Sequence, residues 1–126
     1  MKEKIIFFIC ALFIILIFSC EKKDYYKGEY IIVNDCDETI DCYGVGKNIS
    51  APSVKIHDRI PPKSTLSYRK VDITDKATVK DIFESIEIYK NSEKSIKNPM
   101  NQELWDKLFS NNNLSYTLVV DSTFFN

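Results

Sequence analysis

The stretch GEYIIVN at residues 28–34 decides the fold class of this chain. Its β-branched and aromatic side chains favour an extended strand, and the pair Asn34-Asp35 supplies the turn signal that ends it. A second run with the same bias, SYTLVV at residues 115–120, lies close to the other end of the sequence. Strand-forming sequence at both ends indicates a β-rich domain.

Further strands are expected between these two runs. Prolines flank residues 54–56 and restrict that piece to an edge strand or an extended loop, because proline cannot donate a hydrogen bond to a neighbouring strand. Period-two alternation puts Leu66 and Tyr68 on one face of a later strand, and Ile86 and Ile88 inward in another. The expected strands are residues 39–45, 54–56, 65–71 and 85–90.

Two short helices are also expected. Thr78 can cap a single helical turn in which Val79, Ile82 and Phe83 meet, with Asp81 favourably placed near its N-terminus.

The second expected helix begins after Asn98 or Asn101, with Pro99 at a first-turn position, and the asparagines 111–113 would end it. Helical spacing would gather four apolar side chains on one buried face: Leu104, Trp105, Leu108 and Phe109.

Short strands separated by turns, with little helix, are typical of an antiparallel β-sandwich. The order YIIVND, a proline-serine turn before a strand, and YTLVV ahead of Phe124-Phe125 also resembles small immunoglobulin-like lipoproteins of unknown function. That resemblance implies a fold and no activity. We therefore predict a mainly β protein: a single antiparallel, immunoglobulin-like β-sandwich at residues 28–126 with one or two short helices, preceded by an N-terminal signal helix.

The N-terminus has the layout of a secretory signal. Residues 1–4 include two lysines, and Ile5–Phe18 is a run of fourteen residues without a charge. As a helix this run would span about 21 Å, short of the roughly 30 Å hydrocarbon core of a bilayer. An ordinary signal-peptidase site is absent, because Ile17 and Phe18 are large.

The segment Leu16-Ile17-Phe18-Ser19-Cys20 resembles a loose lipobox, the processing motif of bacterial lipoproteins. The resemblance implies that a diacylglycerol is attached to the Cys20 thiol and that cleavage removes the signal peptide, residues 1–19. Residues 20–27 would then form a polar tether. An uncleaved signal anchor and a soluble secreted form are the alternatives. The lipoprotein interpretation places the protein in the bacterial cell envelope, at the outer membrane, on its periplasmic or surface face.

The charge balance argues against one class of partner. The chain has 17 basic and 18 acidic side chains. Nucleic-acid binding needs a basic field, so no nucleic-acid partner is expected. The expected partners are the membrane, through the lipid anchor, and an envelope protein.

Cys36 and Cys42 are the two cysteines that remain in the expected domain, and an oxidising compartment permits a disulfide between them. A tight hairpin centred on Thr39 would, however, place Asp37 opposite Asp41, and like charges directly across a strand pair are unfavourable. A Cys36–Cys42 disulfide and two buried thiols therefore remain alternatives.

No arrangement of residues points to catalysis. The acidic residues of segment 35–41 have calcium-loop spacing, but Ile40 and Gly46 stand where such a loop needs Gly and Glu. His57 is the only histidine, and no nucleophile elbow accompanies it. We therefore predict no enzyme activity, no catalytic residue, no metal site and no cofactor.

The expected function is contact: a membrane-anchored, non-enzymatic interaction or structural module. The alternative is a module that binds a glycan or a small ligand through exposed aromatic side chains. The rings considered for that role are Tyr25, Tyr26, Tyr43 and Trp105, and helical spacing favours a core position for Trp105. A buried Trp105 would favour the interaction module, and exposed rings would favour the binding module.

Overall fold

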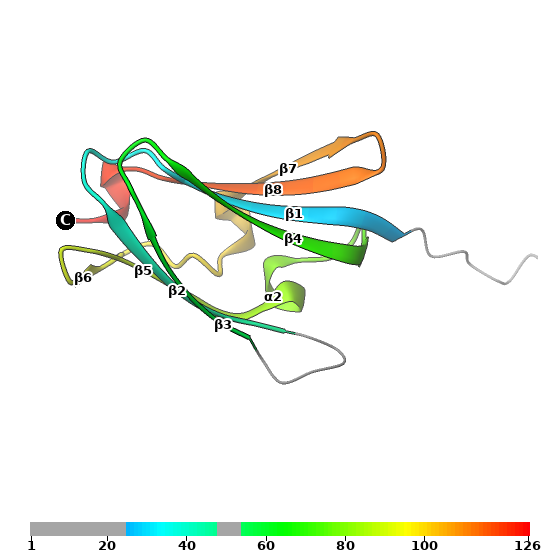
Figure 1. The fold of residues 1–126 in the computed structure, drawn as a ribbon, viewed down its shortest axis with the longest axis horizontal. Helices are drawn as coiled ribbons and strands as arrows, with labels where there is room; N and C mark the ends of the chain where they lie inside the picture. The colour runs from blue at the N-terminus through cyan, green and yellow to red at the C-terminus, as the bar shows by residue number, and fades with distance from the viewer. Residues whose placement is uncertain (1–24, 48–53) are drawn as a thin grey trace, which may run out of the picture.

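The computed structural model describes residues 25–47 and 54–126, in which two four-stranded β-sheets pack face to face (Figure 1). Sheet A has the strand order β4-β1-β8-β7, and sheet B the order β3-β2-β5-β6. The strands are β1 (Tyr25–Asn34), β2 (Ile40–Gly46), β3 (Val54–Ile60), β4 (Thr65–Thr74), β5 (Phe83–Lys90), β6 (Glu93–Lys94), β7 (Trp105–Ser110) and β8 (Asn113–Val120). Three single turns of helix complete the fold: α2 (Val79–Ile82), η1 (Gln102–Leu104) and η2 (Ser122–Phe124). The predicted mainly β sandwich is confirmed.

The centre of sheet A differs from the prediction. Strand β1 pairs antiparallel with β4 and parallel with β8, in a register that sets Tyr30 beside Tyr116 and Ile32 beside Leu118. The wholly antiparallel sandwich is therefore wrong at this pair, while every other strand pair is antiparallel. Strands buried on one face pair where their apolar residues match, and the two runs richest in strand formers meet at the centre of the sheet.

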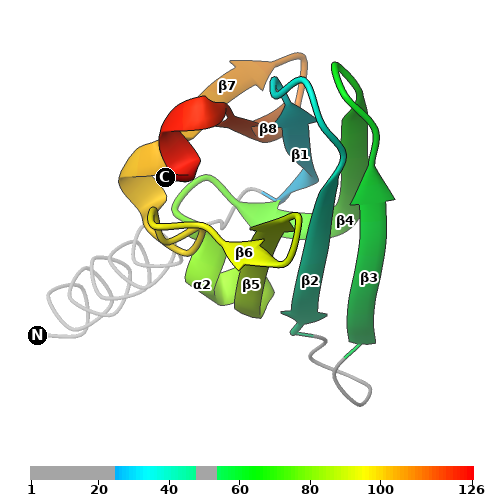
Figure 2. The same cartoon turned by 90° about the vertical axis from the view of Figure 1, so that its left-hand side faces the viewer.

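The chain passes repeatedly from one sheet to the other (Figure 2). Strands β1 and β2 lie in different sheets, so the acidic segment between them is a crossover rather than the hairpin considered around Thr39. The sheets lie closest at the end where the β1–β2 and β3–β4 connections run, and they spread toward α2 (Figure 1). We call these the closed end and the wide end.

The side chain of Asn34 forms hydrogen bonds to several chain segments at the closed end. This residue has no exposed surface. Its Nδ2 donates to the carbonyl oxygens of Glu38 (2.8 Å), Ile60 (2.9 Å) and Pro61 (3.1 Å), and its Oδ1 accepts from the Cys36 backbone N–H (2.9 Å). One buried amide therefore joins the end of β1, the crossover to β2 and the turn between β3 and β4.

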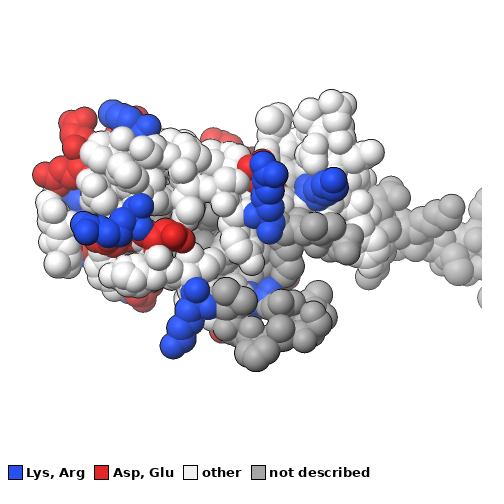
Figure 3. Space-filling view, viewed as in Figure 1, with Lys and Arg blue, Asp and Glu red and all other residues white. Residues whose placement is uncertain are grey.

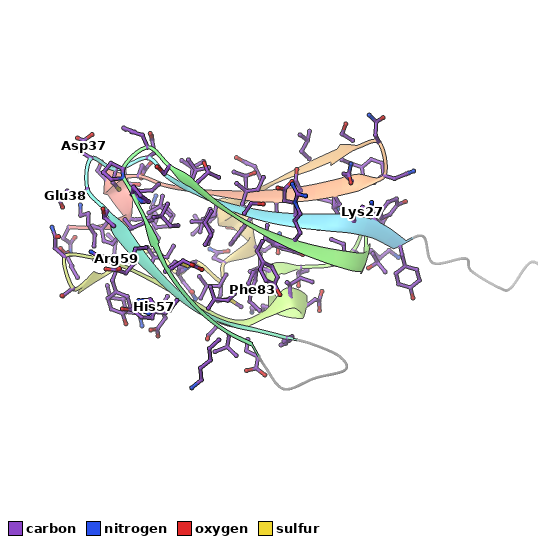
Figure 4. All side chains as sticks on the ribbon, viewed as in Figure 1. Lys27, Asp37, Glu38, His57, Arg59 and Phe83 are labelled. Carbon is purple, nitrogen blue, oxygen red and sulfur yellow. The ribbon has the colours of Figure 1, made fainter. Side chains whose placement is uncertain are left out.

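Aromatic rings fill the wider half of the core. Tyr30 stacks on Tyr116 with ring centroids 5.2 Å apart, and Phe83 and Trp105 approach it edge-on at 5.4 and 6.1 Å. Phe83 lies between the two sheets (Figure 4). Large rings keep the sheets packed where their backbones diverge.

The helix expected after Asn101 is wrong. The chain forms only the short turn η1 and then the strand β7, which pairs with β8 so that Trp105 lies opposite Leu118. Trp105 is buried as expected, whereas Leu108 and Phe109 are 65 and 54 % exposed. The apolar run is too short for its spacing to distinguish a helix from a strand, and pairing with the free edge of β8 decides the outcome.

The other expected elements are present with small shifts. Residues 54–60 form an edge strand, and Ile86 and Ile88 of β5 face the core. The capped turn is also confirmed: the Thr78 backbone N–H donates to Asp81 Oδ2 (2.8 Å) ahead of α2. Strand β1 begins at Tyr25, so the last three residues of the predicted tether belong to sheet A.

Within residues 25–47 and 54–126, no helix has the length and apolar character required to traverse a bilayer.

Candidate functional site

A cleft of about 360 Å³ opens between the edge strands β3 and β4. Both strands lie on the same side of the sandwich, whereas the segment joining β6 to β7 passes over the opposite side (Figure 2). Most of its wall is apolar, formed from both sheets by Tyr30, Ile32, Cys42, Ile56, Leu66, Tyr68, Phe83 and Ile86. The volume is in the range that accommodates a small ligand.

Asp58 is the charged side chain that alternation turns toward this cleft. It is partly buried, on the same face of β3 as Ile56 and Ile60, and pairs across the sheet with Cys42. The pKa of the Cys42 thiol is raised to about 12, mainly because the thiol is buried and to a smaller extent because Asp58 is negatively charged. A thiol that stays protonated is a poor nucleophile. An inward-pointing charge on an edge strand also discourages edge-to-edge aggregation.

The hydroxyl of Tyr30 is buried without a hydrogen-bond partner. The residue lines the cleft and is 1 % exposed. Burial raises the pKa of its phenol above the ordinary value, and the nearby Tyr116 and Asp81 add to this shift. Tyr116 differs, because its own hydroxyl donates to the Ala77 carbonyl at 2.6 Å. Tyr30 therefore contributes to the cleft wall, while its hydroxyl is an unsatisfied polar group buried in the core.

A second candidate surface lies on the outer face of sheet B. Tyr43 of β2 stacks on His57 of β3 with centroids 4.3 Å apart and planes 17° from parallel. Tyr89 of β5 meets Tyr43 edge-on at 5.5 Å. His57 projects from the side of β3 that faces away from sheet A (Figure 4). These three rings, hereafter the sheet B aromatic cluster, form a continuous patch across neighbouring strands.

Charged side chains surround the sheet B aromatic cluster. Arg59 Nε lies 3.1 Å from Asp41 Oδ1, and Lys94 Nζ lies 3.3 Å from Glu87 Oε1. The Tyr89 hydroxyl donates to Glu87 Oε2 (2.9 Å). This hydrogen bond, with the one from Lys94, lowers the pKa of Glu87. The patch thus combines apolar rings with a rim of paired charges, as the core and rim of protein interfaces do.

Two of the three predicted site residues lie in the described part of the chain, and they occupy different elements. Cys20 falls outside the described residues. Cys36 and Cys42 are free, buried thiols in the structure. Cys36 lies in the crossover after β1, where its Sγ contacts the Val120 carbonyl at 3.6 Å, whereas Cys42 lies in the middle of β2. The crossover replaces the hairpin that a short disulfide loop would close.

The aromatic candidates also separate. Trp105 is 5 % exposed and its Nε1 donates to the Pro99 carbonyl at 2.7 Å, so its ring belongs to the core. Tyr25 and Tyr43 are 59 and 40 % exposed. The sequence drew attention to Tyr43 as an aromatic candidate, considered His57 only for catalysis, and did not point to Tyr89. Only the pairing of β3, β2 and β5 brings these rings together, and single-sequence patterns do not specify that register.

No group of three or more metal-ligating side chains occurs in the part of the chain that the structure describes. No protein-family model, curated protein or solved structure matches this chain.

Proposed function

We propose that this protein is a lipoprotein of the bacterial cell envelope, anchored through Cys20, whose sandwich is a non-enzymatic contact module. The sheet B aromatic cluster is the observation that carries this function. Aromatic rings are over-represented at the cores of protein interfaces, and the ion pairs around this cluster provide a polar rim. The partner is another component of the envelope, bound through the outer face of sheet B.

The anchor is supported by the lipobox resemblance and is tested by intact mass. Protein extracted from membranes should have the mass of residues 20–126 plus acyl chains. Cys20→Ala should leave the unprocessed precursor. Normal maturation of that variant would contradict lipidation, and a mass that includes residues 1–19 without lipid would support a signal anchor instead.

The contact surface is tested by placing a photo-crosslinking residue at Tyr43 in intact cells. Thr117 is the matched control, because it lies on the outer face of sheet A and is partly exposed. We expect one discrete adduct from position 43 and none from position 117, with the adduct lost when His57 and Tyr89 are both replaced by alanine. Equal adducts from both positions would contradict a contact specific to sheet B.

The second candidate is a module that binds a small ligand or a glycan. The cleft between β3 and β4 favours this function, because its wall is mostly apolar and its volume suits a small ligand. A neutral apolar dye such as Nile red should brighten in the presence of the protein, and Ile56→Trp should abolish the effect by filling the cleft. Glycan binding on the aromatic cluster would instead be lost in Tyr43→Ala. If neither substitution changes binding, this candidate fails.

We also propose that the sandwich is immunoglobulin-like in the broad architectural sense. Two packed sheets of four strands support this assignment. The strand order is its own, since the first strand lies between the fourth and the eighth, whereas constant-type immunoglobulin domains have the order ABED opposite CFG. Many sandwiches share this architecture without sharing that topology. Amide hydrogen exchange that protects strands of both sheets would support this architecture, and protection confined to one sheet would contradict it.

A further inference from the structure

Apolar side chains gather at the wide end of sheet A, where β1 begins and β7 ends. Tyr25, Leu108 and Phe109 are 59, 65 and 54 % exposed. Tyr26 packs edge-on against Phe109, with ring centroids 4.9 Å apart. We call Tyr25, Tyr26, Leu108 and Phe109 the apolar tip.

The apolar tip extends beyond the packed core. Phe109 lies four residues along β7 from buried Trp105 and on the same face, yet more than half of its surface is open to solvent. The β7–β8 hairpin then turns through Asn111 and Asn112, both with positive φ.

Alternation places Tyr26 and Phe109 on the inner face of sheet A and Tyr25 and Leu108 on its outer face, so exposed apolar side chains occur on both faces of this end. Several large apolar residues at one end of a domain, rather than scattered over its surface, indicate a contact surface.

The short chain distance between Cys20 and β1 places the apolar tip near the proposed lipid anchor. Tyr25 follows Cys20 by five positions in the sequence. A fully extended chain spans at most ~3.6 Å per residue, so the two residues lie within about 18 Å of each other. The closed end lies roughly 30 Å further along β1, at ~3.3 Å per residue. The apolar tip therefore belongs to the end of the domain nearest the anchoring residue.

The chemistry of the apolar tip suits the interfacial zone of a bilayer. Tyrosine rings are enriched there, because they combine an apolar body with a polar hydroxyl, and phenylalanine and leucine contribute buried apolar area. Lys27 follows the tip tyrosines at this end, whereas Asp37 and Glu38 lie at the closed end (Figure 4). The surface over the β7–β8 hairpin is mostly uncharged in the view of Figure 3, with basic side chains beside it.

We propose that the apolar tip rests on the membrane surface that holds lipidated Cys20, with the closed end directed away from it. This inference rests on the proposed lipidation. The tip contact is a second attachment to the membrane, in addition to the acyl chains, and it fixes the orientation of the domain. The outer face of sheet B then lies to the side, where a partner can reach it.

The test uses lipidated full-length protein in vesicles of phosphatidylethanolamine and phosphatidylglycerol with brominated acyl chains, which quench nearby tryptophan fluorescence. Leu108→Trp places a reporter in the apolar tip. Ser122→Trp places one at an exposed position at the closed end, as the matched control. Trp105 is common to both variants and to the unsubstituted protein, whose signal is subtracted. We expect the added tryptophan of Leu108→Trp to be quenched several times more strongly than that of Ser122→Trp. Tyr25→Trp should behave like Leu108→Trp.

The outcomes separate the tip from the anchor. In one outcome, the acylated protein floats with vesicles but the tryptophans of Leu108→Trp and Ser122→Trp are quenched equally. This result would support the lipid anchor and contradict the tip contact. Equal quenching with a doubled mass in detergent would assign the tip to contact between two copies. Protein without acyl chains that fails to float would overturn both the anchor and the contact that rests on it. Circular dichroism of each variant checks that the fold is intact.

Discussion

The two ends of the sandwich differ in how their buried polar groups are satisfied and in how much apolar surface they expose. At the closed end, Asn34 is fully buried. Its side-chain amide donates to three backbone carbonyls and accepts from one backbone N–H. At the wide end, apolar rings fill the core, one tyrosine hydroxyl has no partner, and Tyr25, Leu108 and Phe109 remain exposed. The hydrogen bonds of a buried amide fix the relative positions of the crossover segments that meet at the closed end. Packing between aromatic rings at the wide end is less directional, and apolar side chains remain exposed there for contact.

The largest expected effect comes from breaking the closed end. Asn34→Ala removes one donor group and one acceptor, and it leaves the carbonyls of Glu38, Ile60 and Pro61 without this partner. Buried unsatisfied groups cost ~1–3 kcal/mol each, so we expect a loss of about 3–5 kcal/mol in the free energy of unfolding. Urea denaturation measures it. Ser67→Ala, which removes an exposed hydrogen bond to Glu29, should cost less than ~0.5 kcal/mol.

A loss below ~1 kcal/mol in Asn34→Ala would show that the crossovers do not depend on this amide.

The second prediction concerns pH and the cleft. The pKa of the Cys42 thiol rises from 9.0 to about 12 on folding. Above pH 9 the unfolded chain loses this proton while the folded chain keeps it, so stability should fall between pH 9 and about 12. The slope reaches at most about 1.4 kcal/mol per pH unit. Cys42→Ala should remove this part of the slope, whereas the buried tyrosines contribute equally in both proteins. Parallel stability curves would contradict a protonated, buried thiol.

The third prediction compares two hydroxyl groups in the wide half. Tyr116→Phe removes a hydrogen bond to the Ala77 carbonyl and should cost about 1–2 kcal/mol. Tyr30→Phe removes a hydroxyl that has no partner and should be neutral or stabilising, because an unpaired polar group is released from the core. Thermal and urea denaturation of both variants provide the comparison. Equal costs would mean that the Tyr30 hydroxyl has a partner in solution.

The smallest effect on stability is expected at the apolar tip. Leu108 is 65 % exposed, so Leu108→Ser should change the free energy of unfolding by less than ~0.5 kcal/mol. Leu118→Ser, on the adjoining strand and fully buried, is the matched comparison and should cost several kcal/mol. A large loss in Leu108→Ser would place the tip in the folding core rather than on a contact surface.

The sequence predicted those parts of the fold that depend on local chemistry. Strand formers marked β1 and β8, alternation marked the buried faces of β4 and β5, and Thr78 with Asp81 marked the start of α2. The residues after Asn101 could not be assigned in this way, because Leu104, Trp105, Leu108 and Phe109 fit a helix as well as a strand. The pair Asn111-Asn112 was the available signal, since asparagine favours the positive φ of a two-residue hairpin turn.

The candidate sites depend on contacts between distant segments, and a single sequence carries little information about these. The sheet B aromatic cluster needs the register of β3, β2 and β5, and the cleft needs β3 and β4 to lie on the same side of the sandwich. Tyr25 was assigned to a tether because charged residues surround it. Its place in sheet A follows from pairing with Thr74, near the end of β4.

The parallel pairing of β1 with β8 joins two distant segments of the chain. The first strand cannot acquire its central neighbour until the last strand is available, so sheet A closes a loop that spans almost the entire domain. Contacts between such distant segments slow folding, because much chain entropy is lost before the contact forms. We expect a chain that stops before β8 to leave β1 with an open edge and to remain prone to aggregation. Sheet A is then completed only after β8 has been synthesised.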